Sequence, residues 1–269
     1  MQLPIYQVDA FTSEVFRGNP AAVCPLEAWL PDSTMQAIAA ENNLAETAFF
    51  VPTGESTWHL RWFTPEVEVD LCGHATLAAA FVLFERLGVT GTAISFDTRS
   101  GRLVVTREAG AYTLDFPARR PKPLPRDRQV AVAIGGEPTE LWLARDCMAV
   151  YPTEAEVRAL SPDLAKVKAL GVFAIMATAP ADPALSPGAD FVSRFFAPGA
   201  GIAEDPVTGS AHCTLVPYWA DRLGKTTLEA RQVSRRGGAL RCVLDGDRVR
   251  MTGNAVCYLE GTITIPTAN

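Results

Sequence analysis

The sequence predicts an α+β protein built from two similar halves. Short segments of alternating apolar and polar residues, separated by turn residues, predict many strands and few helices. A strand, a glycine turn and an apolar helix follow one another around Gly73, and a similar order recurs in the second half. With 269 residues, of which 48% are hydrophobic and 20% charged, the chain suits one large domain or two of about 130 residues.

The first elements are two strands followed by a helix. Residues 3–11 and 21–24 are strand-like, and the segment 16–20 between them has the composition of a turn. A helix is expected to begin at residues 31–33, with Asp32 or Ser33 as its cap. It is expected to end at Asn42-Asn43, because Asn tolerates left-handed backbone angles.

The next strand, at 44–51, carries Glu46 on an apolar face. In an extended strand Glu46 points to the same side as Ala48 and Phe50. A carboxylate on such a face is costly to leave charged, which favours a group that gains and releases a proton. In the alternative, Glu46 lies in water near the strand end and has no function.

The helix at 75–84 is apolar all round and is therefore expected to be buried on every side. It is too short to span a membrane, which takes about 20 residues. Its N-terminus carries Cys72, Gly73 and His74, and offers unpaired N–H groups to a small anion. In the alternative, Gly73 only permits the turn and His74 is a satisfied cap.

The residues after this helix complete the first half. They predict strands at 93–97, 102–107 and 112–116. The proline-rich, basic segment 117–125 is interpreted as a connection between domains. We therefore expect an N-terminal domain at 1–117 and a C-terminal domain at 126–269, with the option that the last strand pairs with the first domain.

The second half opens with a strand at 141–150, a helix near 153–160 and a strand at 172–178. Thr153 and Glu156 have the spacing of a capping box.

An internal repeat relates the two halves. Three pairs of matching segments occur in the same order: Arg61–Pro65 with Arg194–Pro198, Gly73 with Gly209, and Arg86–Gly88 with Arg222–Gly224. The first pair is separated by 133 residues and the other two by 136. A period this long indicates a duplicated domain rather than a solenoid.

The repeat places Cys72-Gly73-His74 opposite Thr208-Gly209-Ser210. Two helix ends that face one another would form one cleft between domains, suited to a small carboxylate. Beside the second turn, Asp205 can accept a proton or a hydrogen bond, and Ser210 can donate one. In the alternative, Asp205 caps the following helix and Ser210 is an ordinary first-turn residue.

Several ordered motifs over nearly the whole length resemble the PhzF family of phenazine-biosynthesis-like proteins, within the diaminopimelate-epimerase-like superfamily. They are Val8–Phe11, Phe16–Pro20, Glu46–Phe49, Phe63–Pro65, Cys72–Thr76 and Glu204–Ser210. The resemblance implies two domains, each a curved, mostly antiparallel sheet or barrel around a central helix. It also implies an active site between the domains that needs no cofactor, and a homodimer.

The resemblance also implies roles for individual residues. Glu46 corresponds to the glutamate that shuttles a proton within an allylic substrate. His74, Asp205 and Ser210 correspond to residues that bind or assist. Gly73 and Gly209 are expected to bind substrate, and Asn19 lies in a turn similar to a substrate-binding turn of the superfamily.

The second helix start bears on the type of reaction. Related racemases use two opposed thiols, whereas this chain has Cys72 in one position and Thr208 in the other. A hydroxyl is too weakly acidic to replace the second thiol, which favours an isomerase that moves a proton in a 1,3-shift with Glu46 as single base and acid. The alternatives are an epimerase or racemase that uses Cys72, and a non-catalytic small-molecule binding protein.

Composition and motifs disfavour other classes. The net charge of −6 argues against a nucleic-acid partner. No signal segment is recognised at the start, and six scattered cysteines suit reduced thiols in a cytoplasm rather than disulfides or zinc. His59 and His212 lack metal-ligand spacing, and Ile134-Gly135-Gly136 lacks a dinucleotide-binding pattern, so we expect no metal, no cofactor and no membrane partner.

Overall fold

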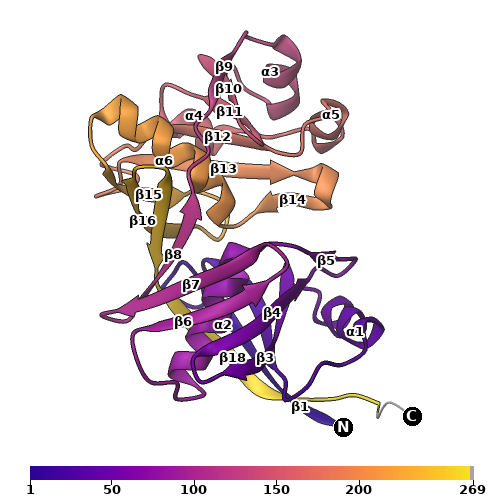
Figure 1. Cartoon of the computed structure of the whole chain (residues 1–269). Coiled ribbons are helices and arrows are strands. Elements are labelled where there is room, and N and C mark those ends of the chain that lie inside the picture. The colour runs from indigo at the N-terminus through magenta and orange to yellow at the C-terminus, as the bar shows by residue number, and fades with distance from the viewer. Residues whose placement is uncertain (267–269) are drawn as a thin grey trace. The chain divides into compact units, whose positions relative to one another are not determined.

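The computed structural model describes residues 1–266 and shows an α+β protein. Contacts divide the chain into two units (Figure 1). Unit 1 contains Met1–Asp115 and the chain from Thr252 onward, and unit 2 contains Phe116–Met251. The last strand pairs with the first, which places the C-terminal segment in unit 1.

Unit 1 is organised around one mixed, mostly antiparallel sheet. Its strands are β1 (Gln2–Ala10), β2 (Asn19–Pro25), β3 (Glu46–Gly54), β4 (Thr57–Phe63), β5 (Glu68–Val69), β6 (Ala93–Thr98), β7 (Gly101–Glu108), β8 (Ala111–Pro117) and β18 (Ala255–Thr264). Antiparallel pairs join β18 to β1, β1 to β2, β3 to β4, β6 to β7 and β7 to β8. The pairs β2–β3 and β4–β6 are parallel.

Unit 2 repeats this pairing scheme. Its strands are β9 (Lys122–Leu124), β10 (Glu140–Leu143), β11 (Cys147–Val150), β12 (Ile175–Pro180), β13 (Phe191–Ala197), β14 (Ile202–Asp205), β15 (Thr227–Gln232), β16 (Gly238–Asp245) and β17 (Arg248–Gly253). The pairs β11–β12 and β13–β15 are parallel, as in unit 1, and β9–β10, β10–β11, β12–β13 and β15–β16 are antiparallel. The two units therefore share one topology, in agreement with the predicted duplication.

One long helix occupies the same place in each unit. Helix α2 (Gly73–Glu85) follows β5, and helix α6 (Gly209–Leu223) follows β14. Every residue of α2 from His74 to Phe84 is buried, and the helix packs against β1, β2, β3 and β18. This confirms the burial predicted from its apolar sequence. Helix α6 packs against β15 and β16 in unit 2.

The repeated Arg-x-Phe motif forms the same interaction twice. In unit 1, Arg61 Nε and Nη2 donate to the carboxylate oxygens of Glu68 at 2.7 and 2.8 Å. In unit 2, Arg194 Nε and Nη2 donate to Glu204 at 2.7 and 2.9 Å. Each guanidinium also lies over the ring of the phenylalanine two residues on, Phe63 or Phe196.

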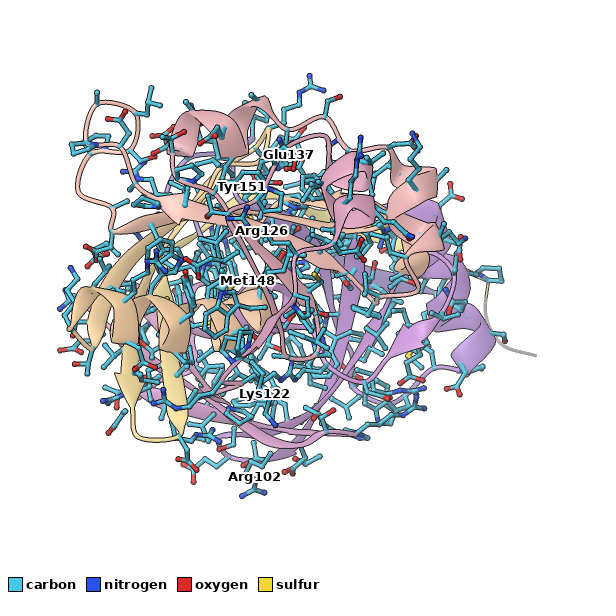
Figure 2. All side chains as sticks on the ribbon, turned by 90° about the horizontal axis from the view of Figure 1, so that it is seen from above. Arg102, Lys122, Arg126, Glu137, Met148 and Tyr151 are labelled. Atoms are coloured by element: carbon cyan, nitrogen blue, oxygen red, sulfur yellow. The ribbon has the colours of Figure 1, made fainter. Side chains whose placement is uncertain are left out.

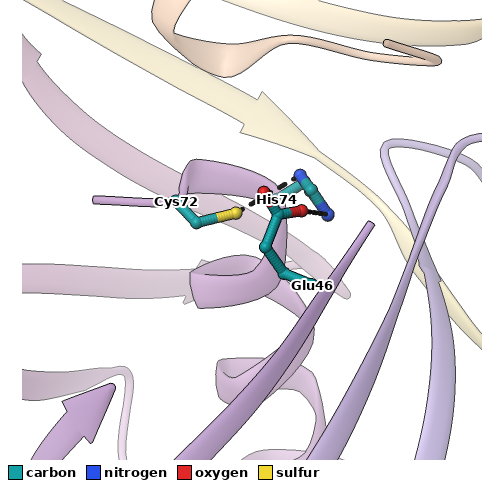
Figure 3. Close-up of side chains that lie close together, drawn as sticks. All are labelled: Glu46, Cys72 and His74. Carbon is teal, nitrogen blue, oxygen red and sulfur yellow. Dashed lines mark hydrogen bonds and ion pairs between the residues drawn. The ribbon is translucent and has the colours of Figure 1, made fainter. Parts of the chain in front are cut away.

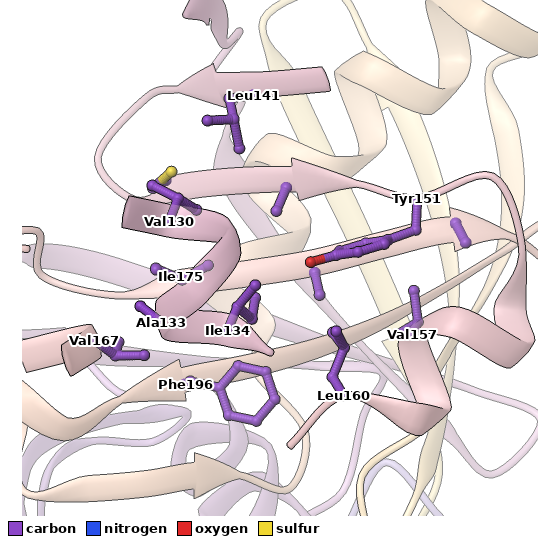
Figure 4. Close-up of a cluster of buried hydrophobic side chains, with 14 of the residues drawn as sticks. Val130, Ala133, Ile134, Leu141, Tyr151, Val157, Leu160, Val167, Ile175 and Phe196 are labelled. Carbon is purple, nitrogen blue, oxygen red and sulfur yellow. The ribbon is translucent and has the colours of Figure 1, made fainter. Parts of the chain in front are cut away.

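Apolar side chains from the smaller helices close the core of unit 2. These helices are α3 (Arg128–Ile134), α4 (Glu154–Ala159) and α5 (Leu164–Ala169). Val130, Val157 and Val167 of these helices pack with Ile175 and Phe196 of the sheet (Figure 4). Met148 and Tyr151 are likewise buried inside unit 2, whereas Arg102 of unit 1 is exposed (Figure 2).

Some helix boundaries match the expectations and one cap does not. Asn43 ends α1 (Asp32–Asn42) with φ 49°, and the Thr153–Glu156 capping box is present at α4. Pro31, however, occupies the N-cap position of α1, so the expected side-chain cap by Asp32 or Ser33 is wrong. Proline supplies the extended backbone of a cap but has no side-chain acceptor.

Two expectations about the connection and the second half also need correction. The segment 117–125 is more than a connection, because Lys122–Leu124 forms β9 and pairs with β10. The expected strand at 141–150 is two strands, β10 and β11, joined by a turn. Helices α3 and α5 were not predicted, although Asp127 and Asp163 cap them with their side chains.

Among the described residues, none of the helices has both the length and the apolar character that crossing a bilayer requires.

Candidate active site

Glu46 begins β3 and is buried. It lies beside Ala21 of the parallel neighbour β2, and the five residues that follow it in β3 are buried too. Only 11% of its side chain is exposed. The alternative of a solvated carboxylate at a strand end is therefore wrong: Glu46 is at the strand end, but the fold removes it from water.

The second residue of α2, His74, lies between three polar side chains of unit 1 (Figure 3 shows two of them). His74 Nε2 lies 3.1 Å from Glu46 Oε2. The other ring nitrogen, Nδ1, lies 3.1 Å from Asn19 Nδ2 and 3.5 Å from Cys72 Sγ. Helix α2 thus begins at the centre of a buried polar cluster, which we call the His74 cluster: Asn19, Glu46, Cys72 and His74.

Burial and neighbouring charge act against each other at His74. Burial lowers the pKa of His74, but the adjacent Cys72 and Glu46 raise it by more, so its pKa lies well above the ordinary value. Burial, reinforced by the charge of Glu46, raises the pKa of Cys72 to about 11. The thiol is therefore protonated near neutral pH and is a poor base there.

Glu46, Cys72 and His74 also offer a carboxylate oxygen, a sulfur and a ring nitrogen within 4.8 Å of one another, a donor set that metals accept. Glu46 Oε2 lies beside Nε2 of the His74 ring and Cys72 Sγ lies beside Nδ1, so each ring nitrogen has a neighbour with which it can share a proton.

Asp205 and Thr208 form a second cluster in unit 2, at the start of α6. Thr208 Oγ1 donates to Asp205 Oδ2 at 2.5 Å. Gln232 fixes the loop between them: its amide donates to Asp205 O at 2.7 Å and accepts from the Thr208 N–H at 2.8 Å. Thr208 is the N-cap residue, and no side-chain hydrogen bond caps the helix. The alternative that Asp205 caps α6 is therefore not what the structure shows.

Ser210 contacts a residue that sequence reasoning missed. Arg145 Nη2 lies 3.1 Å from Ser210 Oγ, and the same guanidinium forms two hydrogen bonds to the buried carboxylate of Asp146. Arg145 lies in the turn before β11, as Asn19 lies at the turn before β2. Each of these turns contacts the second residue of its long helix, and the repeat could have indicated Arg145 through this correspondence.

The seven candidate residues thus fall into two groups. In unit 1, Asn19, Glu46 and His74 are in contact, and Gly73 is the first residue of α2. In unit 2, Asp205 and Ser210 flank the start of α6, whose first residue is Gly209. Both glycines occupy the first helical turn, where N–H groups have no carbonyl partner within the helix.

Comparison with known proteins gives one consistent family. The family model described as phenazine biosynthesis-like protein matches residues 8–261. An uncharacterized isomerase of Pseudomonas aeruginosa is 50% identical over 98% of this chain and 99% of its own length. The human phenazine biosynthesis-like domain-containing protein is 42% identical over 98% of this chain and 100% of its own.

Solved structures agree with these relatives. A PhzF-family phenazine biosynthesis protein of Enterococcus faecalis is 48% identical and superposes with a TM-score of 0.95, covering 98% of this chain and 100% of its own. A hydroxyproline epimerase of Agrobacterium vitis, solved with trans-4-hydroxy-L-proline, is 12% identical with a TM-score of 0.61 over 97% of this chain and 92% of its own; it shares the fold alone. The match over residues 8–261 and the identities of 42–50% show that the chain belongs to the phenazine biosynthesis-like family.

Proposed function

We propose that this protein is an isomerase that moves a proton in a 1,3-shift on a small cyclic or unsaturated carboxylate, without a cofactor, with Glu46 as acid and base. The observation that carries the proposal is the contact between Glu46 Oε2 and His74 Nε2, 3.1 Å apart and almost fully buried. A carboxylate held in this way is removed from water yet keeps a hydrogen-bond donor beside it. Both conditions suit a group that takes a proton from carbon and returns it.

The chemistry balances without an added reactant. Glu46 removes a proton from the carbon next to a double bond, and the electrons of the broken C–H bond form a new double bond as the old one shifts. Glu46 then gives the proton to the far carbon, so no atom is gained and no oxidation state changes overall. Among the described residues, the Glu46 carboxylate forms no hydrogen bond or ion pair outside the His74 cluster, and we propose that its second oxygen meets the substrate.

The contact with His74 also fits this role physically. It is close enough for an ion pair but is not aligned as a hydrogen bond. Catalytic hydrogen bonds are often poorly aligned without substrate and tighten when it binds. The developing negative charge of the substrate can be met by the N-terminus of α2.

The proposal extends to the substrate's polar groups. We propose that the free N–H groups at Gly73 and Gly209 bind its carboxylate, and that Ser210 and Asp205 bind or assist in unit 2, as expected from the sequence.

The six cysteines are all free thiols, which supports the proposal of a reducing, cytoplasmic location. The homodimer expected from the family resemblance remains a prediction.

A second candidate reaction is epimerisation assisted by Cys72. It is favoured by one contact, because Cys72 Sγ lies 3.5 Å from a ring nitrogen of His74 that can accept its proton when the ring is neutral. Against it stand the raised pKa of Cys72, about 11, and the residue in the matching position of unit 2. That residue, Thr208, donates its hydroxyl to Asp205 instead of presenting a thiol.

Hydrogen–deuterium exchange separates these candidates. Small cyclic and unsaturated carboxylates that raise the melting temperature are incubated with the protein in D₂O, and deuterium incorporation is followed by NMR. The proposal expects exchange that is lost in Glu46→Gln and kept in Cys72→Ser. Loss in Cys72→Ser with retention in Glu46→Gln would establish the epimerase instead. Stabilisation by a ligand that never exchanges would support the binding protein and contradict the isomerase.

A further inference from the structure

Asn19 is a polar residue whose side chain is buried inside unit 1. It is the first residue of β2, is fully buried, and pairs in register with Ala10 of β1. The turn before it is locked by Gly18, which has φ +63° and where a Cβ would overlap with the carbonyl oxygen of Ala10. This rigid turn holds Asn19 Nδ2 3.1 Å from His74 Nδ1.

The two ring nitrogens of His74 face groups of different hydrogen-bonding character. Nε2 faces the Glu46 carboxylate, which accepts hydrogen bonds when ionised. Nδ1 faces two donors, the amide nitrogen of Asn19 and the protonated thiol of Cys72. In a neutral imidazole one nitrogen donates and the other accepts, and the hydrogen bond made by one nitrogen decides which.

We infer that Asn19 is a positioning residue: its amide N–H donates to His74 Nδ1 and so keeps the proton of the neutral imidazole on Nε2, facing Glu46. When the imidazolium gives up a proton, it is the one on Nδ1. Asn19 was expected to bind substrate, and this assignment gives it a different task within the same cluster.

The choice of tautomer has a direct chemical consequence, which rests on the proposed function. With the proton on Nε2, Glu46 can be ionised and begin the cycle as a base. With the proton on Nδ1, the lone pair of Nε2 would face the carboxylate, and Glu46 would itself have to carry a proton to avoid repulsion. Where the His74 ring is neutral, Asn19 therefore favours a Glu46 that starts as a base.

His212 serves as an internal reference, because its neutral ring is expected to be the opposite tautomer from that of His74. His212 Nδ1 lies 2.8 Å from the carbonyl oxygen of Thr208 in unit 2. A carbonyl only accepts, so neutral His212 carries its proton on Nδ1. With three histidines in the chain, both tautomers can be read in one spectrum.

The experiment is ¹⁵N NMR of the imidazoles in protein labelled at histidine, titrated from neutral to alkaline pH. His59→Gln and His74→Gln assign the signals. In the wild type we expect the deprotonated His74 ring to be protonated at Nε2 only and His212 at Nδ1 only. In Asn19→Asp, a carboxylate faces Nδ1, so we expect His74 to keep a proton on Nδ1 to higher pH. Asn43→Asp makes the same change at an exposed position of unit 1 and should leave the His74 spectrum unchanged.

Two outcomes overturn the inference: a wild-type His74 protonated at Nδ1 when neutral, or an Asn19→Asp spectrum identical to wild type at His74. An unchanged His212 signal shows that unit 2 remains folded. Where Asn19→Asp does not fold, Asn19→Ala replaces it and should weaken the preference for Nε2–H. The spectra need no substrate, so they test the role of Asn19 independently of the isomerase proposal. On an exchanging substrate, Asn19→Asp should lower kcat about tenfold or more and shift its pH profile, with a smaller change in KM.

Discussion

Glu46 and His74 form a buried pair, with Oε2 and Nε2 3.1 Å apart and only 11% and 6% of the two side chains exposed. The two residues come from different elements, the start of β3 and the start of α2. The fold thus removes the carboxylate from water and places it beside the imidazole and the helix N-terminus.

Replacing Glu46 by Gln should abolish proton exchange with little loss of stability. The amide keeps the shape of the side chain and can accept from His74 Nε2, but it cannot carry the proton. We expect a rate about 10²–10⁴-fold lower, the usual contribution of a positioned acid or base. Deuterium incorporation and the melting temperature are measured side by side. Glu66→Gln, at an exposed position of the same unit, is the control, and an equal loss there would contradict the assignment.

His212 should make the protein sensitive to acid. Burial lowers its pKa from 6.5 to about 4, so the folded state binds this proton less readily than the unfolded chain does. The contribution of His212 to stability is therefore complete above about pH 6.5 and is lost as the pH falls toward 4. By the usual conversion it amounts to about 3 kcal/mol, measured as the change in unfolding free energy over this range.

The repeat supplies the matched variant. Thr76 occupies the position of His212 in unit 1, and its hydroxyl donates to the carbonyl of Cys72 as His212 donates to that of Thr208. His212→Thr should flatten the dependence of the unfolding free energy on pH between 4 and 6.5. It should also cost stability at pH 7, about 1–3 kcal/mol, because the smaller side chain leaves a cavity. A slope as steep as that of the wild type would show that another group is responsible.

Chelation should leave catalysis unchanged. The proposed proton transfer uses Glu46 beside His74 and needs no metal, although Glu46, Cys72 and His74 offer three donor atoms within 4.8 Å of one another. Dialysis against a chelator should therefore leave the exchange rate in D₂O within about twofold of the untreated protein, a margin set against the far larger losses that follow removal of a catalytic metal. Activity that falls on chelation and returns with zinc would contradict the proton-holding role of the cluster.

The sequence indicated the candidate residues of unit 1 because each signal was local. Glu46 in an apolar strand and the all-apolar helix after Gly73 are patterns of burial that a single segment displays. The repeat identified the second long helix in the same way. The contact between Glu46 and His74 was beyond these patterns, because it depends on the register that places β3 beside β2 and the start of α2.

The failures have a common physical cause, which is competition between local preferences and tertiary contacts. The proline-rich segment before α3 had the composition of a linker, yet Lys122–Leu124 pairs with β10 as an added strand. Arg145 and Asp146 lie within the segment 141–150, which was expected to be continuous, and only the fold brings Arg145 to Ser210. That Asn19 binds substrate stays a prediction from its turn, and its contact with His74 Nδ1 was not visible in the sequence.

The turn before Asn19 should tolerate no side chain. In Gly18→Ala the new Cβ would overlap with the Ala10 carbonyl, and φ +63° is strained for alanine. We expect a loss of about 2 kcal/mol or more in unfolding free energy. Gly88→Ala is the control. Gly88 has φ +69° but open space around it, so this variant should lose only the unfolding free energy that the strained backbone costs. Equal losses at the two positions would contradict the steric argument.

The repeated ion pairs should differ in energy when their arginines are removed. The side chains of Arg61 and Glu68 are each 12% exposed, and those of Arg194 and Glu204 are 13% and 23% exposed. Removing Arg194 leaves the Glu204 carboxylate in a mostly buried site without its arginine, which costs about 3 kcal/mol when the burial is nearly complete. When Arg61 is removed, Glu68 keeps Arg99 Nη2 at 2.7 Å. We therefore expect Arg194→Met to destabilise the protein more than Arg61→Met, measured by denaturant unfolding.

Arg61→Lys and Arg194→Lys refine this test. Lysine keeps the charge but cannot form two parallel hydrogen bonds to one carboxylate, so each should recover only part of the loss. Arg61 also bonds Asp32, whose side chain is 73% exposed, and an exposed pair adds little. A loss at Arg61 as large as that at Arg194 would show that Arg99 does not compensate the charge of Glu68, and would contradict the prediction.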